Sequence, residues 1–278
     1  MLTLRKLAPS PALREYVRHY EYREIVSDNR VAVRPLPARP EQLLHFHLLN
    51  RFAYWDHGLH QTVLAPSAIV VGPSTHRTAD LLLRGTFVVF VIVFQPTGFH
   101  QLFRLPMTDL TDRAYEAEDI LGRDVRVVHD RLHHCRQVGD MFHVTEEYLL
   151  GKLRTSHRVH SLQAAAAQML RRHGQVDLQQ LVNLSGLSHR QFRRKFAEQV
   201  GIAPKLYARI NRLQHALQLK AECPTLTWTD VTYRAGYFDQ MHLVKDFKSL
   251  TGEAPSRFLA MLSTDPDVLV PDSLSDPA

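Results

Sequence analysis

The stretch AGYFDQMHLVKDFKSLTGEAPSRF, residues 235–258, decides the fold of the C-terminal part of the chain, because its scheme occurs there twice. Residues 226–258, LTWTDVTYRAGYFDQMHLVKDFKSLTGEAPSRF, align with residues 176–207, VDLQQLVNLSGLSHRQFRRKFAEQVGIAPKLY. Gly186 and Gly236 lie 50 positions apart. The pairs that follow lie 51 apart: Phe192 and Leu243, Phe196 and Phe247, Gly201 and Gly252, Pro204 and Pro255. This spacing predicts two copies of one structural unit.

Capping residues mark where the helices of each copy should begin. Asp177-x-x-Gln180 opens the first copy and Thr227-x-x-Asp230 the second, and such side chains satisfy the free backbone donors of a first helical turn. Each is followed by the glycine, which tolerates the positive φ of a tight turn. A second cap comes next, Ser188 in the first copy and Asp239 in the second. Each copy is therefore predicted to be a helix-turn-helix unit.

The second helix of each copy has one apolar stripe. Phe192 and Phe196, and likewise Leu243 and Phe247, recur at the spacing that points inward. Arginine can pair bidentately with guanine and glutamine with adenine, whereas lysine and serine suit phosphates, so the polar faces indicate major-groove readout. The candidate DNA-contacting residues are Ser188, His189, Arg190, Arg193, Arg194 and Lys195 in the first unit, and Asp239, Gln240, Met241, His242, Lys245 and Lys248 in the second. Because the arginines are in the first helix, we expect it to dominate base readout.

One helix should join the two units. Pro204 stands where a first helical residue is tolerated, and apolar residues follow with helical spacing as far as Cys223-Pro224. Two recognition helices on one rigid connector would reach two adjacent major-groove segments, roughly 34 Å apart on one face of duplex DNA.

The charge of the chain is concentrated in its C-terminal part. The formal net charge is +6 over 278 residues. Residues 161–262 hold 14 lysines and arginines against 7 aspartates and glutamates, whereas residues 1–160 hold 20 against 17. Such a concentration is typical of a phosphate-binding surface, because neutralised phosphates release their counterions. An ordinary solvated surface has the same composition, so charge alone does not decide the function.

Residues 177–258 resemble the tandem helix-turn-helix domain of bacterial transcription regulators of the AraC/XylS type. The family pattern is a small residue and glycine at the turn, an aromatic residue, a Phe-Lys pair, a glycine and a proline; here these are Ala235-Gly236-Tyr237, Phe247-Lys248, Gly252 and Pro255. The resemblance implies base-reading positions at Arg190, Arg193, Arg194, Gln240, Met241 and Lys245. The chain departs from the family at Val182 and Thr232, where alanine is usual, and at Met241, where a polar reader is common. The resemblance also implies an activator or a repressor, with RNA polymerase as a possible partner.

The first half of the chain reads as strands. Residues 42–49, 68–71 and 87–94 are predicted strands, and the last, FVVFVIVF, has the β-branched and aromatic content of a buried one. Proline and glycine in residues 34–40 and 71–76 favour turns there. Residues 126–154 have helical spacing and are predicted to form a helical hairpin element, which could supply a stripe for a homodimer. This half resembles the cupin-like sensory domain found on many AraC/XylS-type regulators.

The predicted fold class is α+β. An N-terminal cupin-like β-barrel or sandwich with a helical extension precedes an all-α domain in which a linker helix joins two helix-turn-helix units. The predicted boundaries are 1–157, 158–262 and a mobile acidic tail at 263–278, with the linker in the polar stretch 151–160 and a helix at 161–172. The N-terminal domain could hold a small-molecule effector. His45, His47, Trp55 and Phe94 are candidate lining residues, although aromatic residues in this half are equally good core.

Two other functions compete with regulation. His45 and His47 share one face of a predicted strand, as in metal-dependent cupin enzymes, and His57, His60 and His76 could add a third ligand. The first acidic residue after this pair is Asp56, so a hydrogen-bonded or exposed histidine pair is favoured and no metal or cofactor is expected. The motifs GxSxG, GxxxxGK[ST] and HExxH do not occur, so no enzyme is predicted. A protein that coats DNA without sequence preference is the other alternative.

The remaining features predict a cytoplasmic protein without membrane contact. No apolar run approaches the roughly 18 residues of a membrane-spanning helix, and the first residues lack the apolar stretch of a secretory signal. Cys135 and Cys223 stand far apart, outside any zinc or redox spacing, so both are expected to be reduced thiols.

Overall fold

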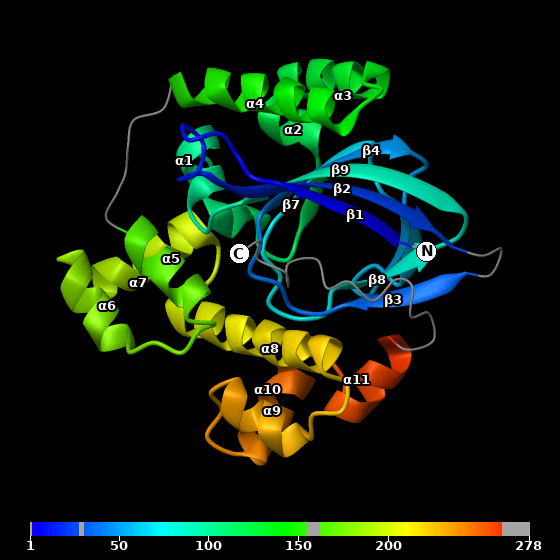
Figure 1. The fold of residues 1–278 in the computed structure, drawn as a ribbon. Coiled ribbons are helices and arrows are strands. Elements are labelled where there is room, and N and C mark those ends of the chain that lie inside the picture. Colours follow the sequence, from blue (N-terminus) through cyan, green and yellow to red (C-terminus); the bar gives the residue numbers. More distant parts are fainter. Residues whose placement is uncertain (1, 28–30, 155–161, 263–278) are drawn as a thin grey trace.

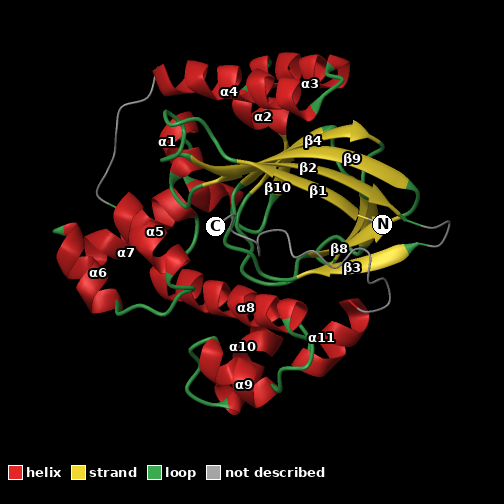
Figure 2. Ribbon diagram, viewed as in Figure 1, coloured by secondary structure: helices red, strands yellow, loops and turns green. Residues whose placement is uncertain are grey.

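The computed structural model describes residues 2–27, 31–154 and 162–262. Helices α2 to α4 lie on one side of a β structure and helices α5 to α11 lie beyond its other side (Figures 1 and 2). This is the α+β architecture that the sequence predicts. The predicted boundary at 157–158 and the predicted tail at 263–278 fall outside the described residues.

Two antiparallel sheets form the N-terminal half, as predicted for a sandwich. One has the strand order β1-β2-β9-β4-β7-β10 and the other the order β3-β8-β5-β6. The strands are β1 (Leu2–Leu7), β2 (Val17–Val26), β3 (Ala32–Leu36), β4 (Leu43–Leu49), β5 (Ala53–Asp56), β6 (Gln61–Leu64), β7 (Ala68–Val71), β8 (Ala79–Leu83), β9 (Thr86–Phe94) and β10 (Ala114–Glu116). The three strands predicted from the sequence correspond to β4, β7 and β9.

Strand β9 lies at the centre of the larger sheet and is buried on both faces. Phe87, Val89 and Val91 pack into the core between the sheets, together with Leu83 of the smaller sheet. The alternate residues, Phe90, Ile92 and Phe94, pack into the core that the helices α1 to α4 cover. A strand covered on both sides has no polar face, which explains the uninterrupted run FVVFVIVF.

The turn predicted at residues 34–40 is wrong in its first part, because β3 contains Pro35. Pro35 pairs with Asp80 of β8, and β3 is an outer strand of its sheet. An outer strand needs ladder donors on one side only, so proline is tolerated there.

The helical extension packs on the larger sheet. Its elements are α1 (Gly98–Phe103), the short 3-10 helix η1 (Met107–Leu110), α2 (Ala117–Leu121), α3 (Asp124–His134) and α4 (Val138–Arg154). The helical element predicted at 126–154 is therefore two helices, which separate at Cys135. Residues 151–154, the first part of the predicted linker, belong to α4 instead, and the rest of that stretch lies outside the described residues.

The C-terminal part is all helical. Its elements are α5 (Gln163–Arg171), α6 (Leu178–Ser185), α7 (His189–Val200), α8 (Pro204–Glu222), α9 (Trp228–Arg234), α10 (Gln240–Thr251) and α11 (Pro255–Leu262). The predicted connector is α8, with Pro204 at its start. It runs between α6 and α7 on one side and α9 and α10 on the other (Figure 1).

The loop after β3 joins the two halves. Ala38 is fully buried, and it belongs to the hydrophobic core of the C-terminal helices although it comes from the N-terminal half. Its backbone N–H donates to the carbonyl of Leu250 over 2.9 Å. At a second junction, the hydroxyl of Thr111 donates to the carbonyl of Gly201 over 2.7 Å, and Gln42 Nε2 donates to the carbonyl of Val200 over 3.2 Å.

Two further observations concern the chain as a whole. Among the described helices, none has the length and apolar character needed to cross a bilayer. Cys135 and Cys223 both carry free thiols, as expected.

Candidate nucleic-acid interface

The first helix-turn-helix unit consists of α6 and α7. The carboxylate of Asp177 accepts a 2.8 Å hydrogen bond from the backbone of Gln179 and begins α6, and Gly186 ends it at φ 66°. Ser188 and Gln191 form a reciprocal capping box at the start of α7. The predicted caps of this unit are confirmed, although Asp177 bonds to the second helical residue alone.

The two faces of α7 differ in chemistry. Phe192 and Phe196 are buried in the core of the C-terminal part. Arg190, Arg193 and Arg194 are exposed on the remaining surface, whereas Lys195 is half-buried. The helix therefore presents three guanidinium groups to solvent from a rigid, capped element.

The second unit, α9 and α10, repeats this construction. Thr227 and Asp230 form the predicted capping box of α9. Gly236 forms the turn at φ 77°, where a Cβ would lie 2.5 Å from the side chain of Gln175. The carboxylate of Asp239 accepts a 2.7 Å hydrogen bond from the backbone of His242 and begins α10. Both predicted helix starts of the second copy are thus confirmed.

The outer face of α10 carries fewer basic groups than that of α7. Gln240, Met241, Lys245 and Lys248 are exposed. His242 is half-buried because its ring packs edge-on against Tyr237 at 5.3 Å between centroids. The remaining surface is therefore mixed, with an amide, a thioether and two ammonium groups.

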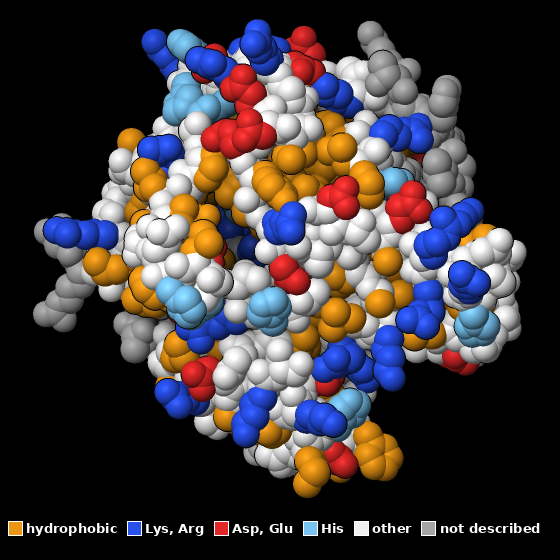
Figure 3. All heavy atoms as spheres, turned by 180° about the vertical axis from the view of Figure 1, so that it is seen from behind, with side chains coloured by type: hydrophobic (Ala, Val, Ile, Leu, Met, Phe, Trp, Pro, Cys, Tyr) orange, Lys and Arg blue, Asp and Glu red, His pale blue; other side chains and the backbone are white. Residues whose placement is uncertain are grey.

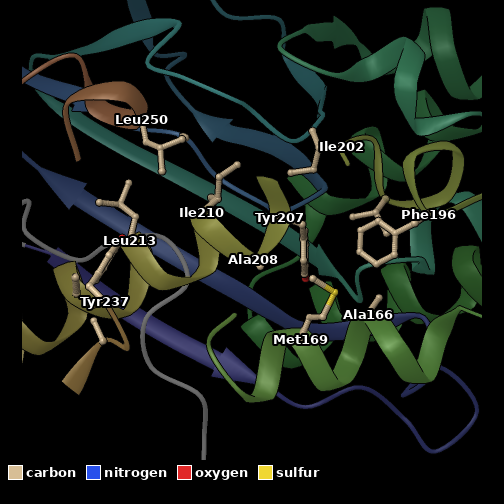
Figure 4. Close-up of a cluster of buried hydrophobic side chains, with 14 of the residues drawn as sticks. Ala166, Met169, Phe196, Ile202, Tyr207, Ala208, Ile210, Leu213, Tyr237 and Leu250 are labelled. Carbon is tan, nitrogen blue, oxygen red and sulfur yellow. The ribbon is translucent and has the colours of Figure 1, made fainter. Parts of the chain in front are cut away.

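Helix α8 holds the two units together. Figure 4 shows Tyr207, Ile210 and Leu213 of α8 between Phe196 of the first unit and Tyr237 of the second. Such packing fixes the distance between the two outward faces.

A buried ion pair adds to this contact. Arg209 Nη2 of α8 lies 2.8 Å from the carboxylate of Asp246 on α10, whose side chain is 5% exposed. The pair ties the second recognition helix to the connector, while the neighbouring side chains of α10 remain free to face a partner.

Basic side chains gather over these units. Figure 3 shows lysine and arginine side chains over the region of α5 to α7 and over the region of α9 and α10, with hydrophobic side chains projecting at the lower end of the molecule. A basic surface on two amphipathic helices that follow tight turns has the charge and shape that suit phosphates and base edges of a major groove.

Comparisons with known families agree with this geometry. Residues 181–261 match the family described as helix-turn-helix domain, and residues 5–116 match a domain of unknown function, DUF6597. Residues 181–261 are an AraC-type helix-turn-helix domain. The C-terminal part of the chain is therefore the DNA-binding domain of a transcription regulator. No curated protein matches the chain.

Three solved structures that match parts or most of the chain have low identities and TM-scores below 0.5. ToxT from Vibrio cholerae O395 is 12% identical, with 88% of this chain and 99% of ToxT covered and a TM-score of 0.47. The AraC-like transcriptional activator CuxR is 8% identical, with 95% and 85% covered and a TM-score of 0.23. A putative ethanolamine utilization protein from Salmonella typhimurium LT2 is 7% identical, with 34% and 68% covered and a TM-score of 0.26.

All twelve residues predicted to contact DNA lie on α7, α10 or their caps. They do not all face outward: Ser188 and Asp239 use their side chains to cap helices, and His242 turns toward Tyr237. Sequence reasoning missed Phe238, which is 86% exposed beside Asp239. The sequence does indicate this residue: the second copy has one extra residue after its glycine, which changes the spacing between the two copies from 50 to 51.

A cavity of about 290 Å³ lies between the two sheets of the N-terminal half. Four arginines line it against two aspartates: Arg23, Arg34, Arg39 and Arg113, and Asp56 and Asp112. Its apolar wall includes Phe52, Ile69, Val71 and Leu81. A hollow with basic side chains inside it opens on the face shown in Figure 3. The walls thus combine an apolar surface with an excess of positive charge.

The candidate effector residues separate into two pairs. His45 and His47 line the cavity, whereas Trp55 and Phe94 do not. Phe94 packs instead against Phe99 and Phe103 of α1, and Trp55 is 37% exposed.

His45 and His47 are both buried, so the exposed alternative for this histidine pair is wrong. Burial lowers the pKa of His47 to about 4, so its ring is neutral at neutral pH. His57, one of the candidate third ligands, lies 3.2 Å from the carboxylate of Asp80. In the described ranges, no three histidine, cysteine or acidic side chains lie close enough together to hold a metal ion.

Proposed function

We propose that the protein regulates transcription by binding one operator at two adjacent major-groove segments, with α7 in one and α10 in the other. The observation that carries the proposal is the pair of capped, amphipathic helices on one connector, each with its apolar stripe buried and its polar face exposed. Because duplex DNA is the proposed partner, the cytoplasm is the proposed location. The proposal assigns the protein no catalytic step.

The side chains proposed to read bases lie on the outer faces of the two helices. In α7 these are Arg190, Arg193 and Arg194, whose guanidinium groups suit guanine O6 and N7. In α10 they are Gln240 and Lys245. Lys195 and Lys248 are proposed phosphate contacts, and Ser188 and His189 border the same surface. Since guanidinium groups make two directed hydrogen bonds, the first unit is proposed to supply most of the specificity.

Selection of bound sites from random DNA tests the proposal directly. The full chain should enrich one motif made of two half-sites about one helical turn apart. Arg194→Ala and Lys245→Ala should each weaken binding of the selected site by about 1–3 kcal/mol where the contact is to a base. Lys205→Ala, an exposed lysine at the start of α8, is the matched control. A specificity ratio near one against random DNA would instead indicate a coating protein.

We also propose that the cavity between the sheets binds an effector with an apolar body and an anionic group. Four arginines line it against Asp56 and Asp112, and one of the four, Arg23, is paired with the buried carboxylate of Glu21, so among these groups one positive charge is in excess. The excess of positive charge would disfavour a cationic ligand and favour an anionic one.

The same cavity adjoins the junction between the halves. Leu36 and Arg39 line it, and Ala38 between them is buried in the core of the C-terminal helices. A ligand that displaced this loop would therefore change the contact of Ala38 with Leu250 of α10. This contact is the proposed path by which an effector alters DNA binding.

Thermal unfolding with matched ligands tests the effector proposal. A series of aliphatic carboxylates should raise the melting temperature, and alcohols of equal length should not. Leu81→Trp, which would fill the apolar part of the cavity without adding charge, should remove the response, whereas Val127→Ser on the exposed side of α3 should keep it. Equal responses to acids and alcohols would contradict the anionic preference. RNA polymerase contact and homodimer formation remain predictions.

A further inference from the structure

Two large apolar side chains stand exposed at the start of α10. Phe238 is 86% exposed and Met241 is 81% exposed. They flank Asp239, whose carboxylate caps the helix, so the backbone beneath them is fixed. Exposed apolar groups that cluster on one surface, unlike single scattered ones, mark a contact with a partner.

The position of Met241 on α10 identifies the face on which the apolar pair lies. Met241, Lys245 and Lys248 follow one another at intervals of four and three residues, so they form one stripe along the helix. Leu243 and Phe247 form the opposite, buried stripe. Met241 and the two ammonium groups therefore lie on the same face of α10, and Phe238 is exposed directly before the cap of this helix.

The repeat gives Met241 a counterpart in the first unit. Arg190 stands 51 positions before it, and Arg194 stands 51 before Lys245. At this position the first recognition helix has a guanidinium group and the second has a thioether. Phe238, in addition, has no counterpart in the first copy. The two recognition helices therefore carry different functional groups at equivalent positions, a guanidinium group on α7 and a thioether on α10.

We propose that Met241 and Phe238 read thymine methyl groups in the half-site bound by α10. The C5-methyl group of thymine is the apolar feature of the major-groove edge, and apolar side chains recognise it by contact. The inference rests on the proposed function, since it assumes that α10 enters the groove. Its consequence is an asymmetric operator, with guanine opposite Arg190 and thymine opposite Met241.

Charge favours DNA over a protein as the partner of this pair. Lys245 and Lys248 extend the stripe along α10, and both are exposed. Two ammonium groups beside the apolar pair suit phosphates that border the groove. Burying Met241 against a methyl group would also remove exposed apolar area from water, which contributes affinity without a hydrogen bond.

Replacing thymine by uracil in the selected operator tests the inference, because uracil lacks only the methyl group. Each thymine of the second half-site is replaced in turn, and the full chain is titrated with each duplex. One or two positions should lose about fourfold in affinity, the factor for one buried methyl-sized group. If no uracil substitution changes the affinity while the operator is still bound, the inference fails and the proposed function stands. If no operator is selected, the proposed function itself fails.

Variants of Met241 test whether this side chain causes the effect. Met241→Ser should weaken binding of the thymine duplex by about fourfold or more and remove the difference between thymine and uracil. Met241→Arg should shift the selected base at that position toward guanine. Val127→Ser also removes an exposed apolar side chain but lies on α3. It should leave the affinity for the thymine duplex and the selected base unchanged. An unaltered selected sequence with Met241→Ser would overturn the proposal and indicate that the pair contacts a protein.

Discussion

The side-chain amide of Gln214 in α8 donates a 2.7 Å hydrogen bond to the carbonyl oxygen of Ala38, which belongs to the N-terminal half of the chain. Both residues are buried, and Ala38 also donates its own N–H to Leu250. The backbone of one residue is therefore held on both sides by the DNA-binding part.

The first prediction concerns this hydrogen bond. Gln214→Leu should lower the free energy of unfolding by about 1–3 kcal/mol, because the buried carbonyl of Ala38 would lose its donor. Urea denaturation measures the change. Gln218→Leu is the matched control, since Gln218 lies one turn further along α8 and bonds to Glu222 at the surface. Equal losses in the two variants would show that the contact with Ala38 contributes nothing specific.

A second prediction compares two glycines of the repeat. Gly201 has φ 97°, and a Cβ there would lie 2.5 Å from Pro73 of the N-terminal half, whereas Gly252 has φ 81° with nothing within 4 Å. Gly252→Ala should cost about 1–2 kcal/mol for the left-handed backbone alone. Gly201→Ala should cost about 1–3 kcal/mol more, because it also overpacks the junction. Denaturant titration of both variants checks this, and a smaller loss for Gly201→Ala would contradict the described junction.

How much the sequence revealed differs between the two parts of the chain. In the repeat, Thr227 and Asp239 predicted helix starts correctly, because capping is a local interaction between residues two to four positions apart. Ala38 gave no such signal, because its burial depends on contacts such as that with Gln214, which lies 176 residues further along the chain. The interior position of His45 and His47 was equally hidden, since alternation shows that both share a face but not that a second sheet covers it.

A third prediction concerns the ion pair between Arg209 and Asp246. Arg209→Met would leave the buried carboxylate of Asp246 without its cation, which should cost about 2 kcal/mol or more, given that Arg209 is partly exposed. The double variant Arg209→Met with Asp246→Leu should recover much of this loss, because no charge is then buried alone. Urea denaturation of the single and double variants provides the measurement. A double variant less stable than Arg209→Met would mean that Asp246 acts through other contacts.

The last prediction is a pH dependence of stability that arises from His47. Burial lowers the pKa of His47 to about 4, below the value of about 6.5 in an unfolded chain. As the pH falls, the unfolded chain therefore binds the proton first, so the contribution of the neutral ring is complete above about pH 6.5 and is lost progressively toward pH 4. The melting temperature of His47→Gln should accordingly fall less between pH 7 and pH 5 than that of the natural chain. His143→Gln removes an exposed histidine from α4 and should retain the natural slope. Identical slopes for all three proteins would show that His47 is not buried as a neutral ring.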